Sequence, residues 1–338
     1  MVFKRIECGK HSILFLKNEY LQAKHLINII IFHQRNGEKV VGTTVRKIKG
    51  YVIRDWMMSY LFLLPAFGFF LLFVAYPMIK GVYISFFDYS LRDFSFIGLD
   101  NYISLFKDDN FMKSMGNTLL LVVITVPIVI IFSLFVSMNI YKKKEFARSF
   151  FRGVFYLPAV SSVVSITVVW GWIYHPNYGI LNYLTGLFGL EPVSWLGDTR
   201  TALLAIIVVL ITTSVGQPII LYVASIGNIP TSYIEAAEID RATPWQIFRK
   251  ILWPMLMPTN LYIIVITTIN TFQCFALIQL LTSGGPVYST STVMYGVYEQ
   301  AFMLGHFGYA SAMGVILAIV IGIISIIQFK YFGSDVEY

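Results

Sequence analysis

Residues 226–260 read IGNIPTSYIEAAEIDRATPWQIFRKILWPMLMPTN and form a polar interruption between two long apolar segments. Near its start, Ser232 precedes Glu235 by three residues, which is the spacing of a capping box that begins a helix. The resulting helix, about 233–241, presents alanines on one side and acidic residues on another. Helices that lie on lipid headgroups usually present Lys and Arg, so this acidic helix favours docking into another protein.

A second helix start follows within the same stretch. Thr243 precedes Gln246 by three residues, and Pro244 occupies the first helical position, where its missing N–H is tolerated. We therefore expect a helix at about 244–252, joined to the first by a sharp turn. Two prolines should end it before the next apolar segment begins, Pro254 and Pro258.

The segments on either side are apolar enough to cross a membrane. Of the 338 residues, 57% are hydrophobic and 13% are charged, whereas a soluble domain carries about 25% charged residues. We predict an all-α membrane protein with six transmembrane helices, because six segments lack Asp, Glu, Lys, Arg and His and have about the 20 residues that a span needs. They are Met57–Ile79, Thr118–Ile140, Val154–Tyr174, Ala202–Ser225, Leu261–Leu281 and Tyr309–Phe329.

The distribution of basic residues sets the expected orientation. The two ends of the chain and the second and fourth connections together contain 20 Lys and Arg residues, and the other connections contain 5. Both termini and the loop 226–260 should therefore lie in the cytoplasm. The predicted parts are a basic cytoplasmic extension (1–55), a transmembrane domain (56–332) and a short tail (333–338). The net charge of +7 follows this topology and forms no basic face with aromatic residues, so we expect no nucleic-acid partner.

The fourth and fifth segments contain polar but uncharged side chains. They are Thr212, Thr213, Ser214, Gln217, Thr267, Thr268, Asn270, Thr271 and Gln273. Such residues either join helices by hydrogen bonds or line a polar pathway. Since the segments lack ionisable groups, a pathway here suits a neutral, hydroxyl-rich solute, and its energy should come from another source.

The stretch EAAEIDRATPWQIFRKILWPMLMP closely resembles the EAA loop of bacterial ABC import permeases. In that family the loop is a coupling helix that sits in a cleft of a cytoplasmic ATPase. The resemblance assigns this role to Glu235, Ala236, Ala237, Asp240, Arg241 and Ala242. Arg241 departs from the family pattern, which usually has glycine there, and a left-handed backbone would cost arginine about 1 kcal/mol.

Other motifs narrow the resemblance to the carbohydrate-type permeases. LTSGGP at Leu281–Pro286, followed by Ser289 and Thr290, is similar to a signature of the MalF-like member of the permease pair. Further matching motifs are Tyr76-Pro77, Gly98–Tyr102, Asn117-Thr118, Tyr156–Pro158 and Gly308–Ala310. The resemblance covers residue 56 to the end. Residues 1–50 are either a cytoplasmic extension or the result of a start codon assigned too early.

The resemblance implies a multi-pass subunit of an ATP-driven importer in the bacterial cell membrane. Its partners would be a second, MalG-like permease, two ATPase subunits and an extracytoplasmic sugar-binding protein, with membrane lipid around it. The chain has no GxxxxGK[ST] motif, so ATP and Mg²⁺ should bind to the ATPase, and we expect no cofactor or metal in this chain.

Sugar-contacting positions of the maltose importer correspond to Thr212, Ser214, Val215, Gly216, Ile219, Thr267, Thr271 and Cys274. Together with the polar pattern, the candidate substrate pathway is Thr212, Ser214, Gly216, Gln217, Thr267, Asn270, Thr271, Gln273 and Cys274.

Three other functions stay open. A non-sugar ABC permease, for glycerol phosphate or a polyamine, also carries an EAA loop. A secondary carrier is disfavoured because the segments lack ionisable groups and show no inverted repeat. A membrane enzyme is disfavoured because no catalytic pair lies within the segments, and His175 and His306 are outside them. The two cysteines, Cys8 and Cys274, form no disulfide or metal pattern.

Overall fold

The computed structural model describes residues 58, 60–90 and 94–333, and the predicted extension 1–55 lies outside them. The chain divides into two compact units, Met1–Pro77 and Met78–Tyr338. The helix Tyr60–Ile84 includes a π-helical stretch, η1 (Leu71–Ala75), and ends as α3 (Tyr76–Ile84).

A short β-hairpin follows this helix and corrects the all-α prediction. β1 (Phe87–Tyr89) pairs antiparallel with β2 (Phe94–Phe96), with Phe87 opposite Phe96. The strands are rich in aromatic residues, which favour a pleated conformation and stabilise cross-strand pairs. The rings of Phe87 and Phe94 stack with their centroids 4.7 Å apart.

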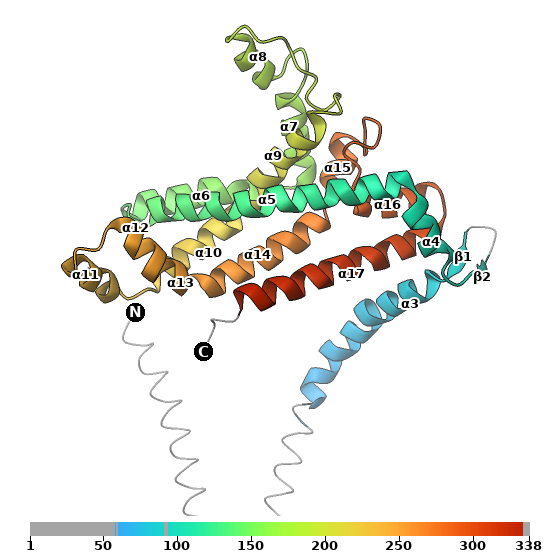
Figure 1. Ribbon diagram of the computed structural model, residues 1–338, viewed down its shortest axis with the longest axis horizontal. Helices are drawn as coiled ribbons and strands as arrows, with labels where there is room; N and C mark the ends of the chain where they lie inside the picture. The colour runs from blue at the N-terminus through green and yellow to red at the C-terminus, as the bar shows by residue number, and fades with distance from the viewer. Residues whose placement is uncertain (1–57, 59, 91–93, 334–338) are drawn as a thin grey trace, which may run out of the picture. The chain divides into compact units, whose positions relative to one another are not determined.

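The other regular elements of the described chain are helices (Figure 1). The elements are α4 (Asp100–Lys107), α5 (Asp109–Tyr141), α6 (Glu145–Val160), α7 (Val163–Ile173), α8 (Ile180–Gly186), α9 (Ala202–Ser214), α10 (Gly216–Gly227), α11 (Thr231–Ile239), α12 (Pro244–Ile247), η2 (Phe248–Leu252), α13 (Trp253–Met255), α14 (Met257–Phe272), α15 (Ala276–Leu281), α16 (Val293–Tyr298), η3 (Glu299–Met303) and α17 (Phe307–Phe332).

Three helices are long and apolar enough to span a membrane as single helices, and six spans are reached if each of three bent pairs counts as one. The single helices are Tyr60–Ile84, Asp109–Tyr141 and Phe307–Phe332. The bent pairs are α6 with α7 at 99°, α9 with α10 at 41°, and Pro244–Met255 with α14 at 68°. The predicted third and fourth segments are therefore not continuous helices, and the predicted fifth segment, Leu261–Leu281, is interrupted between α14 and α15.

The bend between α9 and α10 has a local cause. Pro218 has no N–H, so the ordinary helical hydrogen bond to the carbonyl of Ser214 is missing, and helices bend at such positions. Two serines of α5 donate to neighbouring carbonyls at this bend. The Ser133 hydroxyl lies 3.4 Å from the Val215 carbonyl oxygen, and the Ser137 hydroxyl lies 3.1 Å from that of Ile219.

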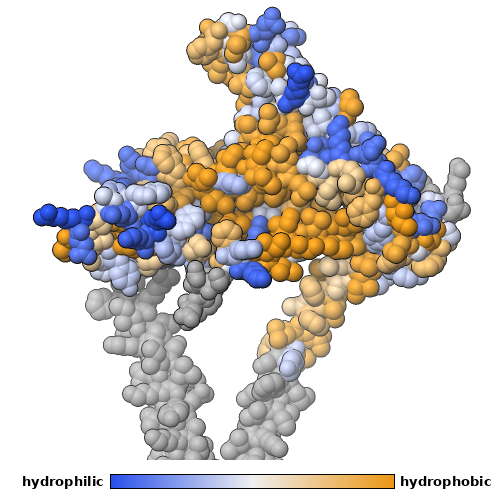
Figure 2. Space-filling model, viewed as in Figure 1, coloured by the Kyte–Doolittle hydropathy of each residue, from blue (hydrophilic) through white to orange (hydrophobic). Residues whose placement is uncertain are grey.

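α5 is the central helix of the bundle (Figure 1). α9, α10 and α14 pack against it, and α17 packs against α14. Figure 2 shows hydrophobic residues over the middle of this body and hydrophilic residues over α11 and α12 at one end. In lipid, packing and interhelical hydrogen bonds hold helices together, because lipid tails are as apolar as the side chains. The buried polar contacts of α5 therefore contribute to the specificity of the fold.

Candidate functional site: an exposed helical segment and a polar cavity

The first helix of the predicted coupling segment is α11. It begins one residue after Pro230, whose side chain cannot cap it, and Ser232 and Glu235 make no capping box. That part of the prediction is wrong: Pro230, with φ −60° and ψ 127°, sets the helix start before Ser232 is reached. The helix still carries Glu235, Ala236 and Ala237 in its middle turns.

The turn after α11 is a Schellman motif with Arg241 at its left-handed position. The Ala242 N–H donates to the Ala237 carbonyl (2.9 Å), and the Arg241 N–H donates to the Glu238 carbonyl (3.0 Å). Arg241 has φ +57°, where a side chain is strained and glycine is favoured. Arginine therefore keeps the turn geometry that glycine would supply, at a cost in free energy.

The second helix begins with the predicted capping box. The Thr243 hydroxyl accepts from the Gln246 N–H (3.3 Å), and the Gln246 side-chain oxygen accepts from the Thr243 N–H (2.7 Å). The predicted stop at Pro254 is wrong, because the helix continues to Met255 and bends at Leu256. The preceding η2 is a π-helix, and Pro254 falls in the first turn after it, where a missing N–H is tolerated.

The segment presents both acidic and apolar side chains to its surroundings. Glu235, Ala236, Asp240 and Arg241 are exposed, and Ala237 and Ala242 are half-buried. Ile239 is 82% exposed although it is apolar. An exposed isoleucine beside carboxylates, at the hydrophilic end of the bundle, marks a surface suited to a protein partner.

Two hydrogen bonds fasten the base of this segment to the bundle. The hydroxyl of Tyr222 in α10 donates to the Asn260 side-chain oxygen in α14 (2.7 Å), and both residues are buried. The hydroxyls of Ser225 and Thr259 lie 2.7 Å apart. The helices that enter and leave the segment are therefore joined to each other where it starts and ends.

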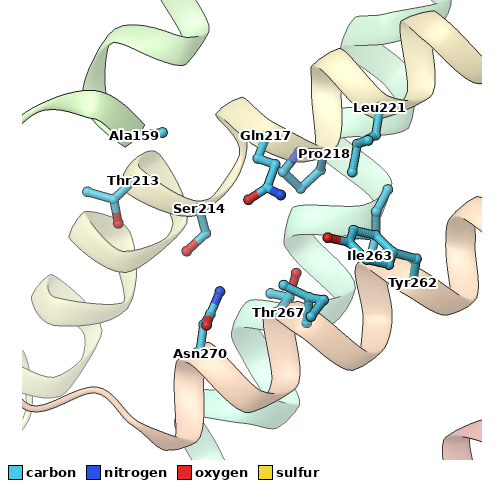
Figure 3. Close-up of a pocket in the computed structure, with 11 residues that line it drawn as sticks. Ala159, Thr213, Ser214, Gln217, Pro218, Leu221, Tyr262, Ile263, Thr267 and Asn270 are labelled. Carbon is cyan, nitrogen blue, oxygen red and sulfur yellow. The ribbon is translucent and has the colours of Figure 1, made fainter. Parts of the chain in front are cut away.

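A cavity of about 210 Å³ lies between α6, α9, α10 and α14. Figure 3 shows the polar side chains of Ser214, Gln217, Thr267 and Asn270 facing this space. The remaining lining residues are Ala159, Thr213, Pro218, Leu221, Tyr262, Ile263 and Ile266, so no charged residue lines it. Within the described part of the chain, the amides of Gln217 and Asn270 have no hydrogen-bond partner, which leaves their donors and acceptors available to a solute.

The other five predicted pathway residues do not line this cavity. The Thr212 hydroxyl donates to the carbonyl of Val209 (2.7 Å), and Thr212 borders a separate groove at the α6–α7 bend. Gly216 allows close packing on α6, since a Cβ there would lie 2.6 Å from the Phe155 carbonyl oxygen. Three residues lie near the end of α14, two of them buried and the middle one exposed: Thr271, Gln273 and Cys274.

Tyr262 is a polar cavity residue that sequence reasoning missed entirely. A signal for it exists in the helical spacing, because Tyr262, Ile266 and Asn270 recur every four residues and share one face of α14. Thr213 is among the polar residues of the fourth segment but not in the candidate substrate pathway predicted from the sequence. The combination of helical period with polarity would have selected both.

The loop that follows the LTSGGP motif, residues 287–291, forms a polar clip with α5. The Asn117 amide donates to the carbonyls of Tyr288 (3.1 Å) and Ser291 (2.9 Å), and the Lys113 ammonium donates to that of Val287 (2.6 Å). Close to this clip, the Glu299 carboxylate raises the pKa of the Tyr288 hydroxyl through its negative charge, with burial adding to the effect. The loop after the motif therefore has a structural role in the described chain.

A bundle of apolar helices with an uncharged cavity and an exposed helical segment is the architecture of a membrane permease. Residues 106–338 match the family of binding-protein-dependent transport system inner membrane components. The chain belongs to this family, whose members are permease subunits of ABC transporters and have no enzymatic activity of their own.

Relatives with known names agree with this assignment. The probable ABC transporter permease protein YurN of Bacillus subtilis is 36% identical over 85% of this chain and 99% of its own length. The multiple sugar-binding transport system permease protein MsmF of Streptococcus mutans is 34% identical over 76% of this chain and 89% of its own. A bacterial alginate ABC transporter, solved in complex with a periplasmic protein that holds an alginate pentasaccharide, superposes with a TM-score of 0.73 and 26% identity over 83% of this chain and 95% of the matched chain.

Proposed function

We propose that this chain is one permease subunit of an importer that takes up a sugar or oligosaccharide with energy from a separate ATPase. The observation that carries the proposal is the exposed segment from α11 to α13, which holds Glu235, Ala236 and Ala237 outside the bundle. The family membership supports it, because binding-protein-dependent transporters draw their energy from an ATPase partner.

The segment is built to transmit motion. Its left-handed turn and its capping box define one conformation, and the Tyr222–Asn260 and Ser225–Thr259 bonds join its two ends. A displacement of α11 by an ATPase would therefore move α10 and α14 together. Both helices line the polar cavity, so the proposed coupling route is short and continuous.

The cavity supports a neutral, hydroxyl-rich solute. Its polar groups are hydroxyls and amides, which both donate and accept hydrogen bonds, as sugar hydroxyls do. The similarity to MsmF and to the alginate transporter supports a sugar or oligosaccharide, although alginate itself is acidic. A phosphate ester or a polyamine would need charged side chains, which this cavity lacks.

The proposed assembly contains this chain, a second permease, two ATPase subunits that bind ATP and Mg²⁺, and an extracytoplasmic binding protein. The alginate transporter was solved with its periplasmic protein, which supports the last of these partners. We propose six spans with both ends in the cytoplasm of a bacterium: the three long single helices, α6 with α7, α9 with α10, and α14 alone. In this topology the segment α11–α13 faces the cytoplasm.

The test is transport by the complete complex in proteoliposomes. Glu235→Lys, or Ala236→Arg, should leave the chain inserted and the subunits assembled but lower ATP-dependent uptake at least tenfold, because each change places a positive charge on the docking face. Glu191→Lys in the connection between α8 and α9 is the matched control and should transport normally. Uptake by Glu235→Lys equal to that of the unmodified complex would contradict the proposal.

A panel of solutes tests the substrate class in the same vesicles. Neutral oligosaccharides, glycerol 3-phosphate and spermidine are compared, each with its cognate binding protein where one is known. Uptake of an oligosaccharide alone supports the proposed class. Uptake of glycerol 3-phosphate or spermidine would contradict the proposed substrate class in favour of a non-sugar ABC permease, and uptake without the ATPase subunits would contradict the proposed energy source.

A further inference from the structure

An apolar groove of about 590 Å³ separates the C-terminal third of α5 from the helix made by α12, η2 and α13. α5 contributes Ile131, Phe135 and Met138, and the other wall contributes Trp245, Phe248 and Trp253. The aromatic rings of that wall form a continuous surface, with ring centroids 5.4 Å apart for Trp245 and Phe248. The volume lies in the range of sites for small ligands, about 300–1,000 Å³.

The groove is open and strongly apolar. Ile131 is 68% exposed and Trp245 is 66% exposed. Apart from the two indole N–H groups, the lining side chains carry no polar atom that can form a strong hydrogen bond. Neither indole N–H has a hydrogen-bond partner in the described chain.

Five cationic side chains are adjacent in sequence to residues of the two walls of the groove. Lys142, Lys143 and Lys144 come after the last residue of α5, and Arg249 and Lys250 follow Phe248 in η2. Lys142 is four residues beyond Met138, which is about 6 Å along a helix. Within the described residues, none of these five cationic groups is paired with a carboxylate.

We infer that this groove holds one acyl chain of an anionic phospholipid, whose phosphate lies among these basic side chains. The inference rests on the proposed topology, which places this end of α5 at the cytoplasmic surface. Basic clusters at that surface attract anionic lipid, and tryptophans gather at the same depth. A protein helix could fill an apolar groove, but nothing in such a helix requires five cations along its walls.

The position of the lipid gives it a role in coupling. It contacts α5 on one side and, on the other, the helix that carries motion from the coupling turn toward α14. A bound acyl chain would fill the space between them, so that the two walls move as one body. Anionic lipid should therefore increase the ATPase activity that the loaded binding protein stimulates.

The experiment uses the complete complex in phosphatidylcholine nanodiscs with a phosphatidylglycerol analogue that carries a photoactivatable group at the end of one acyl chain. Mass spectrometry then locates the labelled peptides. Ile131→Trp fills the groove, and Val123→Trp is its control, since Val123 is 66% exposed on α5 but lies outside the groove. Arg249→Gln with Lys250→Gln removes two cations, with Lys107→Gln as the control.

We expect label in residues 130–138 and 245–253, and a large loss of it in Ile131→Trp but not in Val123→Trp. Removal of two cations should weaken the labelling about 30-fold, which corresponds to about 1 kcal/mol for each cation at 1.4 kcal/mol per tenfold. The controls should label normally, and binding-protein-stimulated ATPase activity should rise with the phosphatidylglycerol content.

Two results would overturn the inference in favour of nonspecific lipid. One is equal labelling by a phosphatidylcholine analogue, and the other is unchanged labelling in the variant with Arg249→Gln and Lys250→Gln. A cross-link from Ile131→Cys to the partner permease would also overturn it, because that subunit would then fill the groove. Glu235→Lys separates the two proposals, because it should abolish uptake while the lipid labelling persists. Normal uptake in that variant would refute the ATPase coupling and leave the lipid site standing.

Discussion

Replacing Arg241 with glycine should stabilise the coupling turn. Arg241 lies at φ +57°, where an L-residue with a side chain loses about 1–2 kcal/mol relative to the right-handed region. Glycine avoids this strain but loses more conformational entropy on folding, about 0.5–1 kcal/mol. The net gain expected for Arg241→Gly is therefore about 0.8 kcal/mol, or roughly fourfold in the equilibrium between closed and open turn.

Hydrogen exchange of the backbone amides at positions 241 and 242 measures this directly, because both amides form the Schellman bonds. Exchange through local opening should slow about fourfold in Arg241→Gly. Arg241→Ala is the matched control, since it removes the same charge without relieving the strain. Equal protection in the glycine and alanine variants would refute the strain argument and attribute any effect to the charge.

Three further substitutions test other parts of the structure. Thr243→Ala removes one half of the capping box and should lower local stability at the start of α12 by about 1 kcal/mol, seen as faster amide exchange there. Gly308→Ala should lower the melting temperature of the purified protein, because the added Cβ would overlap the backbone carbonyl of Phe87. Gly314→Ala is its control and should melt normally, because no atom lies within 4 Å of the added Cβ. Tyr222→Phe leaves the buried Asn260 without its donor, should cost about 1–3 kcal/mol, and should lower ATP-dependent uptake with assembly intact; unchanged uptake and melting would count against the proposed fastening.

Local signals predicted much of the coupling segment. The Thr243 capping box and Pro244 at the helix start appear in the structure as expected, because both depend on neighbours within three residues. The Ser232 box failed because Pro230 begins the helix earlier. The residue pattern at Arg241 identified the strained position, and the structure shows that the backbone adopts the left-handed conformation.

The low charge of the spans does not predict their bends, although Pro218 marks the bend between α9 and α10. The absence of charged residues indicates that a segment can lie in lipid. It does not indicate whether the helix in that segment is straight. The 99° bend between α6 and α7 occurs at Ser161 and Ser162, where the Ser161 hydroxyl donates to the Leu157 carbonyl (2.7 Å) and Ser162 caps α7. The hairpin was missed because its strands have only three residues each, too few to show a period.

For the cavity, polarity was a better guide than correspondence to a relative. Gln217 and Asn270 were chosen for their polarity, and both line the cavity. Val215 and Ile219 were matched to the maltose importer, yet both are buried against α5. The break after Ser214 rotates the following helix relative to the preceding one, so a position that faces a solute in one permease can face the core in another.

The most direct test of ATPase coupling is site-specific photo-cross-linking from position 239. Ile239 is the most exposed apolar residue of α11, and a photoreactive amino acid there should preserve the helix. In the assembled complex, the proposed coupling predicts a cross-link to the ATPase subunit whose yield changes when ATP is bound. Cross-links to lipid or to the extracytoplasmic binding protein, with none to the ATPase in any nucleotide state, would contradict it.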